Sequence, residues 1–282
     1  MTKLDAHQHF WKYSAAEYEW IDDSMATLQR DFLPADLQPL LATNGFDGSI
    51  VVQARQSLEE TRWLLDLAAE NDFIHGVVGW VDLCSPEIGK QLEHFAQNKK
   101  LVGVRHVVQG EPDDEFMLRP AFRRGIGLLH QFGLAYDLLI YPKHLPVAAK
   151  LVSEFPQQRF VLDHIAKPRI ADGVLEPWAR DIRELAKAPH VACKLSGMVT
   201  EAHWQKWKPV DFKPYLETVL ETFGPDRLMI GSDWPVCTVS ADYGMAMSLV
   251  KDFIGGLSAS ERDGVLGENC ARAYELAERT RG

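Results

Sequence analysis

The sequence has few cysteines and no long apolar run, and each shortage excludes a class of protein. Its four cysteines, Cys84, Cys193, Cys237 and Cys270, stand far apart without C-x-x-C spacing, so neither a disulfide framework nor a zinc knuckle is expected. No window approaches the roughly 20 apolar residues of a membrane span, and the N-terminus has no cationic start followed by an apolar stretch. We therefore expect a cytoplasmic protein.

Runs of lysine and arginine are also missing. The chain has 30 lysines and arginines against 40 aspartates and glutamates, which gives a formal net charge of −10. Nucleic acids and anionic membranes bind cationic surfaces, so neither is an expected partner. A small molecule is the expected partner, and the sequence leaves a homo-oligomer open.

The sequence does contain a regular alternation of strand-like and helix-like segments. Residues 57–60 (SLEE), for example, form a candidate capping box that opens a helical stretch. Eight βα units without a Pro/Gly/Ser-rich linker predict an α/β protein in which residues 1–282 form a single (β/α)₈ barrel. An open doubly wound sheet is the alternative, but no glycine-rich phosphate loop follows the first strand. The expected strands are 4–10, 48–54, 75–81, 102–108, 134–140, 159–165, 191–197 and 227–233.

The segment from Trp11 to Asp36 is too long for a simple βα turn. It is rich in tryptophan, tyrosine and acidic residues. In a barrel such an insert would lie over the mouth, where it would line or cover a pocket.

The first strand carries an H-x-H pattern. Alternate residues of a strand share a face, so Asp5, His7 and His9 are expected on one side and Leu4 and Ala6 on the other. Two neighbouring imidazoles are half of a metal site. The alternative is a pair of buried histidines whose only role is to form hydrogen bonds.

Two later strands end in residues of the same kind. Barrel enzymes carry their catalytic groups at the C-terminal ends of the strands. His164 ends the sixth expected strand and Asp233 ends the eighth, so both should meet His7 and His9 at one rim. Asp163 precedes His164, and alternation is expected to turn it to the barrel exterior or to let it orient a neighbour.

Six phrases in order carry a resemblance to a known family. "DAHQHFW", "VVQARQSLEET", "GVRHVVQ", "LDHIAKP", "KLSG" and "GSDWPV" are similar to the lactone-hydrolysing branch of the amidohydrolase superfamily, whose members open sugar lactones such as L-fuconolactone and L-rhamnonolactone. The strand-four bridging ligand and strand-five histidine of its two-metal members are absent here, because Arg105 and His106 occupy strand four and Tyr136 and Asp137 occupy strand five.

The resemblance implies one divalent metal at most. Zn²⁺ or Mn²⁺ would suit His7, His9, His164 and Asp233 as ligands, and the same histidines could also polarise a carbonyl without a metal. Asp233 would remove a proton from water and return it to the ring oxygen of a lactone. Whether the metal is essential stays open.

Other residues near the strand ends are candidates for substrate binding. Arg105 and His106 cannot both point inward from a regular strand, and Arg105 is preferred; Lys194 is a further candidate donor. A mixture of donors, acceptors and aromatic rings suits a polyhydroxylated sugar ring. The expected substrate-binding residues are Gln53, Arg55, Arg105, His106, Asp137, Trp11 and Trp234.

Three other functions compete with a sugar lactonase. Arg55 and Arg105 could clamp the carboxylates of a pyrone dicarboxylate, and a muconolactone is a related substrate. A metal-dependent decarboxylase would need a fuller ligand set. A non-catalytic binding barrel would be expected to have lost the H-x-H pattern or Asp233, and both are present.

Overall fold

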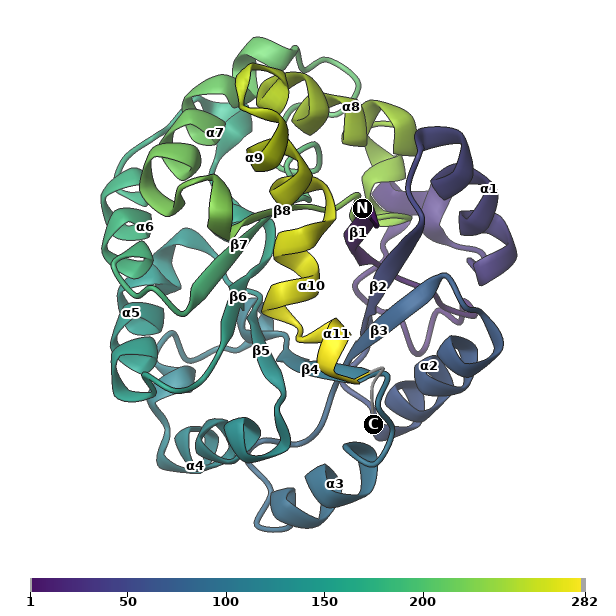
Figure 1. Cartoon of the computed structure of the whole chain (residues 1–282), viewed down its shortest axis with the longest axis vertical. Helices are drawn as coiled ribbons and strands as arrows, with labels where there is room; N and C mark the ends of the chain where they lie inside the picture. Colours follow the sequence, from purple (N-terminus) through teal and green to yellow (C-terminus); the bar gives the residue numbers. More distant parts are fainter. Residues whose placement is uncertain (1, 280–282) are drawn as a thin grey trace.

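The computed structural model describes residues 2–279, and its centre is a ring of eight parallel strands (Figure 1). The strands pair in chain order from β1 to β8, and a parallel bridge from Gln8 to Trp234 joins β1 to the chain just after β8. The predicted α/β barrel is confirmed and all eight expected strands are present, but each ends two or three residues before its expected end. The strands are β1 (Leu4–Gln8), β2 (Gly48–Val52), β3 (Ile74–Gly79), β4 (Leu101–His106), β5 (Ala135–Leu138), β6 (Phe160–Leu162), β7 (Val191–Leu195) and β8 (Leu228–Ile230).

A layer of helices covers the outside of the strands. In the helix Trp178–Ala186, for example, the side chains of Trp178, Ile182 and Leu185 are buried against the barrel. The side chains of Arg183 and Glu184 are exposed. This spacing of buried and exposed residues is typical of an amphipathic helix. The covering helices are α1 (Pro34–Asn44), α2 (Leu58–Glu70), α3 (Ile88–Phe95), α4 (Pro120–Leu129), α5 (Leu145–Glu154), α6 (Trp178–Ala186), α7 (Pro209–Phe223) and α8 (Tyr243–Phe253).

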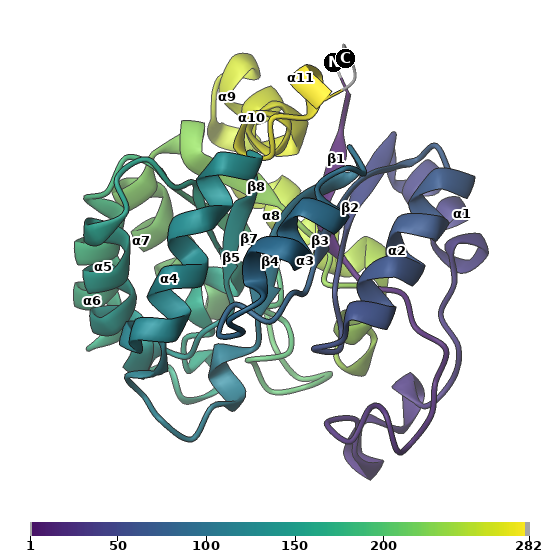
Figure 2. The same ribbon diagram turned by 90° about the horizontal axis from the view of Figure 1, so that it is seen from below.

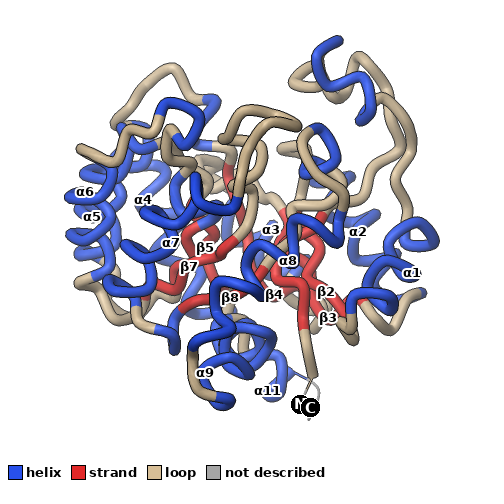
Figure 3. Tube along the Cα trace, turned by 90° about the horizontal axis from the view of Figure 1, so that it is seen from above, coloured by secondary structure: helices blue, strands red, loops and turns tan. Residues whose placement is uncertain are grey.

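The C-terminal segment closes the N-terminal end of the barrel (Figure 2). It forms the short helices α9 (Ala259–Asp263), α10 (Asn269–Ala273) and α11 (Leu276–Arg279). Cys270 and Tyr274 pack inside the ring against an apolar floor that includes Leu4 and Ala6 of β1. The loops gather at the opposite end (Figure 3), so any pocket in the barrel must open there.

The insert between β1 and α1 lies beside that open end, where Figure 2 shows it in purple. A bridge between Trp11 and Phe32 joins its two ends, and the Trp11 indole donates to the Arg30 carbonyl at 2.9 Å. Its short 3₁₀ helix spans Asp23–Leu28. Within residues 2–279, no helix is both long and apolar enough to cross a membrane.

The candidate capping box before α2 is only half formed. Ser57 accepts hydrogen bonds from the backbone N–H groups of Glu59 and Glu60, as an N-cap should. The Glu60 carboxylate does not return to Ser57 but accepts from the N–H groups of Ala54 and Arg55, at 3.0 and 2.8 Å. Glu60 therefore fixes the loop that follows β2.

Candidate active site

A bulge in β1 brings His7 into the barrel. The register between β1 and β2 shifts between Asp5 and Gln8, so that strict alternation fails there. Asp5 points outward, and its carboxylate accepts from the hydroxyl of Ser232, just after β8, at 2.6 Å and from that of Tyr243 in α8 at 3.1 Å. The expectation that Asp5 shares a face with the two histidines is wrong. His7 and His9 do lie together, with their Nε2 atoms 3.1 Å apart.

A left-handed turn after β6 places two adjacent side chains in the interior. Residues 164 to 167 all have positive φ, with 53° at His164 and 50° at Lys167, so the alternation of the strand ends at Asp163. Both Asp163 and His164 are buried inside the ring. A Cβ on Gly197 would lie 2.4 Å from Nδ1 of His164, so the chain needs a glycine beside this imidazole.

Asp163 does not face the barrel exterior, and that expectation is wrong. Its carboxylate lies 2.9 Å from Arg105 Nη1, 2.9 Å from Lys194 Nζ and 3.3 Å from His7 Nδ1. These contacts fit the other part of the expectation, that Asp163 orients a neighbour. Burial alone would raise its pKa, but Lys194, His7 and Arg105 hold the pKa well below the ordinary value.

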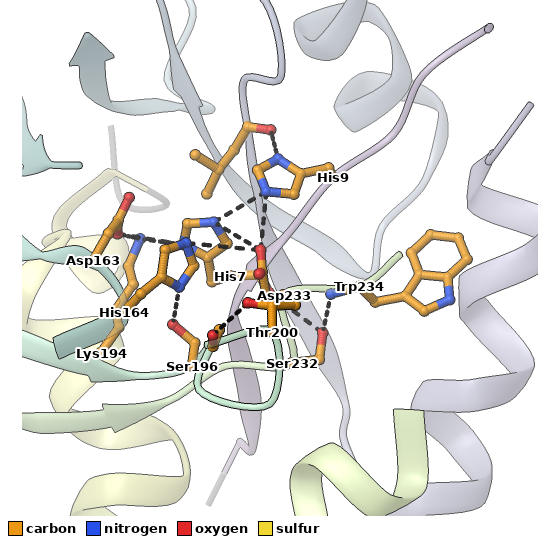
Figure 4. Close-up of polar contacts among 12 residues, drawn as sticks. His7, His9, Asp163, His164, Lys194, Ser196, Thr200, Ser232, Asp233 and Trp234 are labelled. Atoms are coloured by element: carbon orange, nitrogen blue, oxygen red, sulfur yellow. Dashed lines mark hydrogen bonds and ion pairs between the residues drawn. The ribbon is translucent and has the colours of Figure 1, made fainter. Parts of the chain in front are cut away.

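Three imidazoles surround one oxygen of Asp233 (Figure 4). Oδ1 of Asp233 lies 3.3 Å from Nε2 of His9, 3.7 Å from Nε2 of His7 and 3.8 Å from Nε2 of His164. The four side chains come from β1 and from the chain just after β1, β6 and β8, and all are buried. The structure therefore brings together all four residues expected at the rim.

The protonation of this group follows from its outer contacts. Nδ1 of His9 lies 2.8 Å from the carbonyl oxygen of Val52, which can only accept, so Nδ1 carries the proton and Nε2 presents a lone pair toward Asp233. Burial lowers the pKa of His164 to about 4 and lowers that of His7 as well, so both are neutral at pH 7.

The Asp233 carboxylate stays ionised. Burial alone would raise its pKa, but His164 and His7, which are cationic in acid, hold the pKa below the ordinary value. A lone pair that faces a carboxylate oxygen needs a proton or a cation between them. Ligand atoms of His7, His164 and Asp233 lie within 4.8 Å of one another, so these residues fit a divalent metal, and His9 adjoins them.

A buried cluster of charges lies beneath the imidazoles. Nζ of Lys194 is 2.6 Å from Asp137 and 3.2 Å from Nδ1 of His7, and the Tyr274 hydroxyl donates to Asp137 at 2.7 Å. Burial raises the pKa of Asp137 to about 6, while Lys194 acts in the opposite direction. Burial alone would lower the pKa of Lys194, but the carboxylates of Asp137 and Asp163 raise it. Lys194 is therefore charged.

Above the imidazoles a cavity of 1060 Å³ opens at the loop end of the barrel. His9, His164 and Asp233 line its base, and the 11–36 insert contributes Glu17 and Trp20 to its wall. The expectation that the insert lines a pocket is confirmed, although the insert lies beside the mouth and not over it. Further lining residues come from loops that the sequence reasoning did not single out, namely Gln109, Tyr141, Lys167, Thr200, Glu201 and Trp204.

Arg55 and Arg105 line this cavity, but both are engaged by the protein. Nη1 of Arg55 lies 2.6 Å from Glu17. Nε of Arg105 donates to the side chain of Gln53 at 2.9 Å, and its Nη1 donates to Asp163 at 2.9 Å. Gln53 therefore holds Arg105, and it is not itself among the residues that line the cavity.

The other expected substrate contacts lie away from the cavity. His106 stacks on Phe116 with 4.8 Å between ring centroids, and Asp137 lies in the charge cluster. Trp11 and Trp234 each pack against Phe32 with 5.3 Å between centroids. The structure thus gives these four side chains structural contacts in place of the substrate contacts expected from the sequence.

Comparison with known proteins agrees with this geometry. The model of a family described as Amidohydrolase matches residues 4–276. This chain belongs to the amidohydrolase family. The amidohydrolase is 41% identical to a curated L-fucono-1,5-lactonase of Burkholderia multivorans over 98% of this chain and 97% of that relative. It is also 39% identical to a curated L-fucono-1,5-lactonase of Burkholderia ambifaria, over 86% of this chain and 83% of the relative.

A solved structure shares the whole fold of the amidohydrolase. It is an amidohydrolase from Burkholderia multivorans with bound zinc, with a TM-score of 0.94 and 41% sequence identity. The match covers 98% of this chain and 100% of the solved chain. A family member at this similarity therefore holds zinc.

Proposed function

We propose that this amidohydrolase hydrolyses the ester bond of a sugar lactone, L-fucono-1,5-lactone or a similar 6-deoxy aldonolactone, to the aldonic acid. The observation that carries the proposal is the carboxylate of Asp233, ringed by three imidazoles at the base of a cavity. The similarity to curated L-fucono-1,5-lactonases over nearly the whole chain supports the same substrate class.

Asp233 is the proposed general base and acid. Its ionised oxygen removes a proton from water while the water oxygen attacks the lactone carbonyl carbon. The bond from that carbon to the ring oxygen then breaks, and Asp233 returns the proton to the departing ring oxygen. His7, His9 and His164 surround the Asp233 carboxylate, and a cation held among these imidazoles would stabilise the carbonyl oxygen as it gains negative charge.

The proposed metal site is His7, His164 and Asp233, with His9 adjoining. When bound there, a divalent ion would supply Lewis-acid stabilisation to the carbonyl oxygen. The zinc in the Burkholderia multivorans structure favours Zn²⁺ over Mn²⁺ for this site. Neutral imidazoles at His7 and His164 are the form that metal binding requires.

The charges around the cavity favour a neutral lactone over a pyrone dicarboxylate. Arg105 is committed to Gln53 and Asp163, and Nη1 of Arg55 is paired with Glu17, so a clamp of two carboxylates by the two guanidinium groups would have to break these contacts. The wall also presents the carboxylates of Glu17 and Glu201, which would repel a dianion.

Acid release from L-fucono-1,5-lactone tests the proposal, after subtraction of the rate without enzyme. The wild type should be active, and Asp233→Asn should lose about 100-fold or more in kcat because its amide cannot accept the proton from water. A chelated sample measures how much of the rate depends on metal. Turnover of a pyrone dicarboxylate together with inactivity on every aldonolactone would contradict the substrate assignment.

We also propose, from the sequence alone, that residues 1–282 form one domain and that the enzyme acts in sugar catabolism in the cytoplasm. A homo-oligomer stays a prediction.

A further inference from the structure

Two charged residues of the cavity wall have no part in the proposed chemistry. Lys167 follows the left-handed turn after β6, and Glu201 lies in the loop after β7; both line the cavity. Their side chains are 17% and 23% exposed. Nζ of Lys167 lies 3.7 Å from Oε1 of Glu201, which is longer than a hydrogen bond.

The backbone fixes both residues. The N–H of Lys167 donates to the carbonyl of His164 at 2.8 Å, so the turn that places the His164 imidazole also places Lys167. The N–H of Glu201 donates to Met198 at 3.0 Å, and its carbonyl accepts from Ala171 at 2.9 Å. Two groups held in this way need little ordering when a ligand binds.

The pair retains hydrogen-bonding capacity on both sides. An ammonium has three donor hydrogens and a carboxylate has several acceptor lone pairs, so one approach at 3.7 Å satisfies neither group. Burial raises the pKa of Glu201, and Lys167 opposes that rise. Tyr141 adds an aromatic wall, with its ring centroid 5.9 Å from Nζ of Lys167.

We infer that Lys167 and Glu201 recognise two neighbouring hydroxyl groups of the lactone ring, with Lys167 donating to one and Glu201 accepting from the next. Adjacent ring hydroxyls lie close enough together to be bound by a donor and an acceptor that are themselves neighbours. Both side chains share one cavity with Asp233, so a ring held there would present its ester to the catalytic group. The inference rests on the proposed function and names the residues that select a polyhydroxylated ring.

The test compares L-fucono-1,5-lactone with δ-valerolactone, a six-membered lactone without ring hydroxyls. The measured quantity is the ratio of kcat/KM for the sugar lactone to kcat/KM for δ-valerolactone. Lys167→Met and Glu201→Gln should each lower this ratio about 10- to 100-fold, the effect of losing a hydrogen bond to a charged group. If δ-valerolactone turns over too slowly to measure, the inference requires a rise in KM for the sugar lactone that exceeds the fall in kcat.

A matched control is the exposed pair of Glu184 in α6 and Lys187 just after it, whose Oε2 and Nζ lie 2.6 Å apart. Lys187→Met and Glu184→Gln make the same chemical changes outside the cavity, and the ratio should stay within about twofold of the wild type. Circular dichroism of all four variants checks that each is folded.

Two results would overturn the inference. The first is a wild-type ratio and a wild-type KM in both cavity variants. The second is a Glu201→Gln variant that loses kcat equally on both lactones, because Glu201 would then transfer a proton to every substrate. Failure of the proposed function looks different, since the wild-type enzyme itself would release no acid from the aldonolactone.

Discussion

Replacing Asp163 by asparagine should destabilise the protein strongly, because it unbalances a buried set of charges. The cluster contains the cations Arg105 and Lys194 and the carboxylates Asp137 and Asp163, so its formal charges cancel. All four side chains are buried. Asp163→Asn leaves one uncompensated positive charge in the interior.

The expected cost in the free energy of unfolding is about 3 kcal/mol, the lower end of the range for breaking a buried ion pair. The lower end applies because the asparagine oxygen can still accept the hydrogen bond from Nη1 of Arg105. Lys194 also keeps its contact with Asp137 at 2.6 Å. Urea unfolding, followed by the fluorescence of the eight tryptophans, measures the difference from the wild type.

Asp172→Asn is the matched control. Asp172 forms an ion pair with Arg169 at 2.7 Å, but the two side chains are 48% and 68% exposed. Water screens such a pair, so the same substitution there should cost less than about 1 kcal/mol. Equal costs at Asp163 and Asp172 would refute the reasoning that burial makes the cluster sensitive to its charge balance.

Three further outcomes are expected. Burial raises the pKa of Glu60 from 4.5 to about 7, so the contribution of Glu60 to stability is present below pH 4.5 and is lost as the pH rises through about 7. Urea unfolding should therefore give a lower free energy of unfolding at pH 8 than at pH 5 in the wild type. The difference should be smaller in Glu60→Gln. Metal analysis should find at most about one divalent ion per chain, and a second ion would show that further residues act as ligands. Arg55→Met and Glu17→Gln break the same ion pair. Both variants should therefore raise the KM for an aldonolactone to a similar extent, less than about tenfold. A much larger effect of Arg55→Met alone would indicate that Arg55 contacts the substrate directly.

The sequence was sufficient to predict the barrel, because each strand is encoded by its own short run of apolar residues. The four rim residues were also predictable, since the C-terminal ends of parallel strands meet at one end of a barrel. The rule of alternation failed at Asp5 and Asp163. A bulge and a left-handed turn interrupt the strands there, and both depend on contacts with distant chain segments that the local pattern does not contain.

Five of the seven expected substrate-binding residues do not line the cavity, for a different reason. A position near a strand end does not specify how deep the side chain lies in the barrel. Asp137, for example, lies beneath the imidazoles, where Lys194 and Tyr274 contact it. Lys167 and Glu201 lie in loops, where no periodic pattern marks the residues that face a cavity. The phrase "LDHIAKP" contains Lys167, but only the turn shows that this side chain lines the same cavity as His164.

The turn after β6 links three levels of the site. Asp163 lies in the charge cluster, His164 in the ring of imidazoles and Lys167 on the cavity wall, although the three residues span only five positions. A regular strand would turn alternate side chains outward, whereas consecutive left-handed residues redirect the chain within the barrel mouth. Such backbone is unfavourable for residues other than glycine, so the surrounding contacts must compensate for its cost. The close approach of Gly197 to His164 is one such contact, and it explains why Ser196 and Gly197 follow β7: the serine hydroxyl lies 2.9 Å from Nδ1 of His164, and the glycine leaves room for the ring.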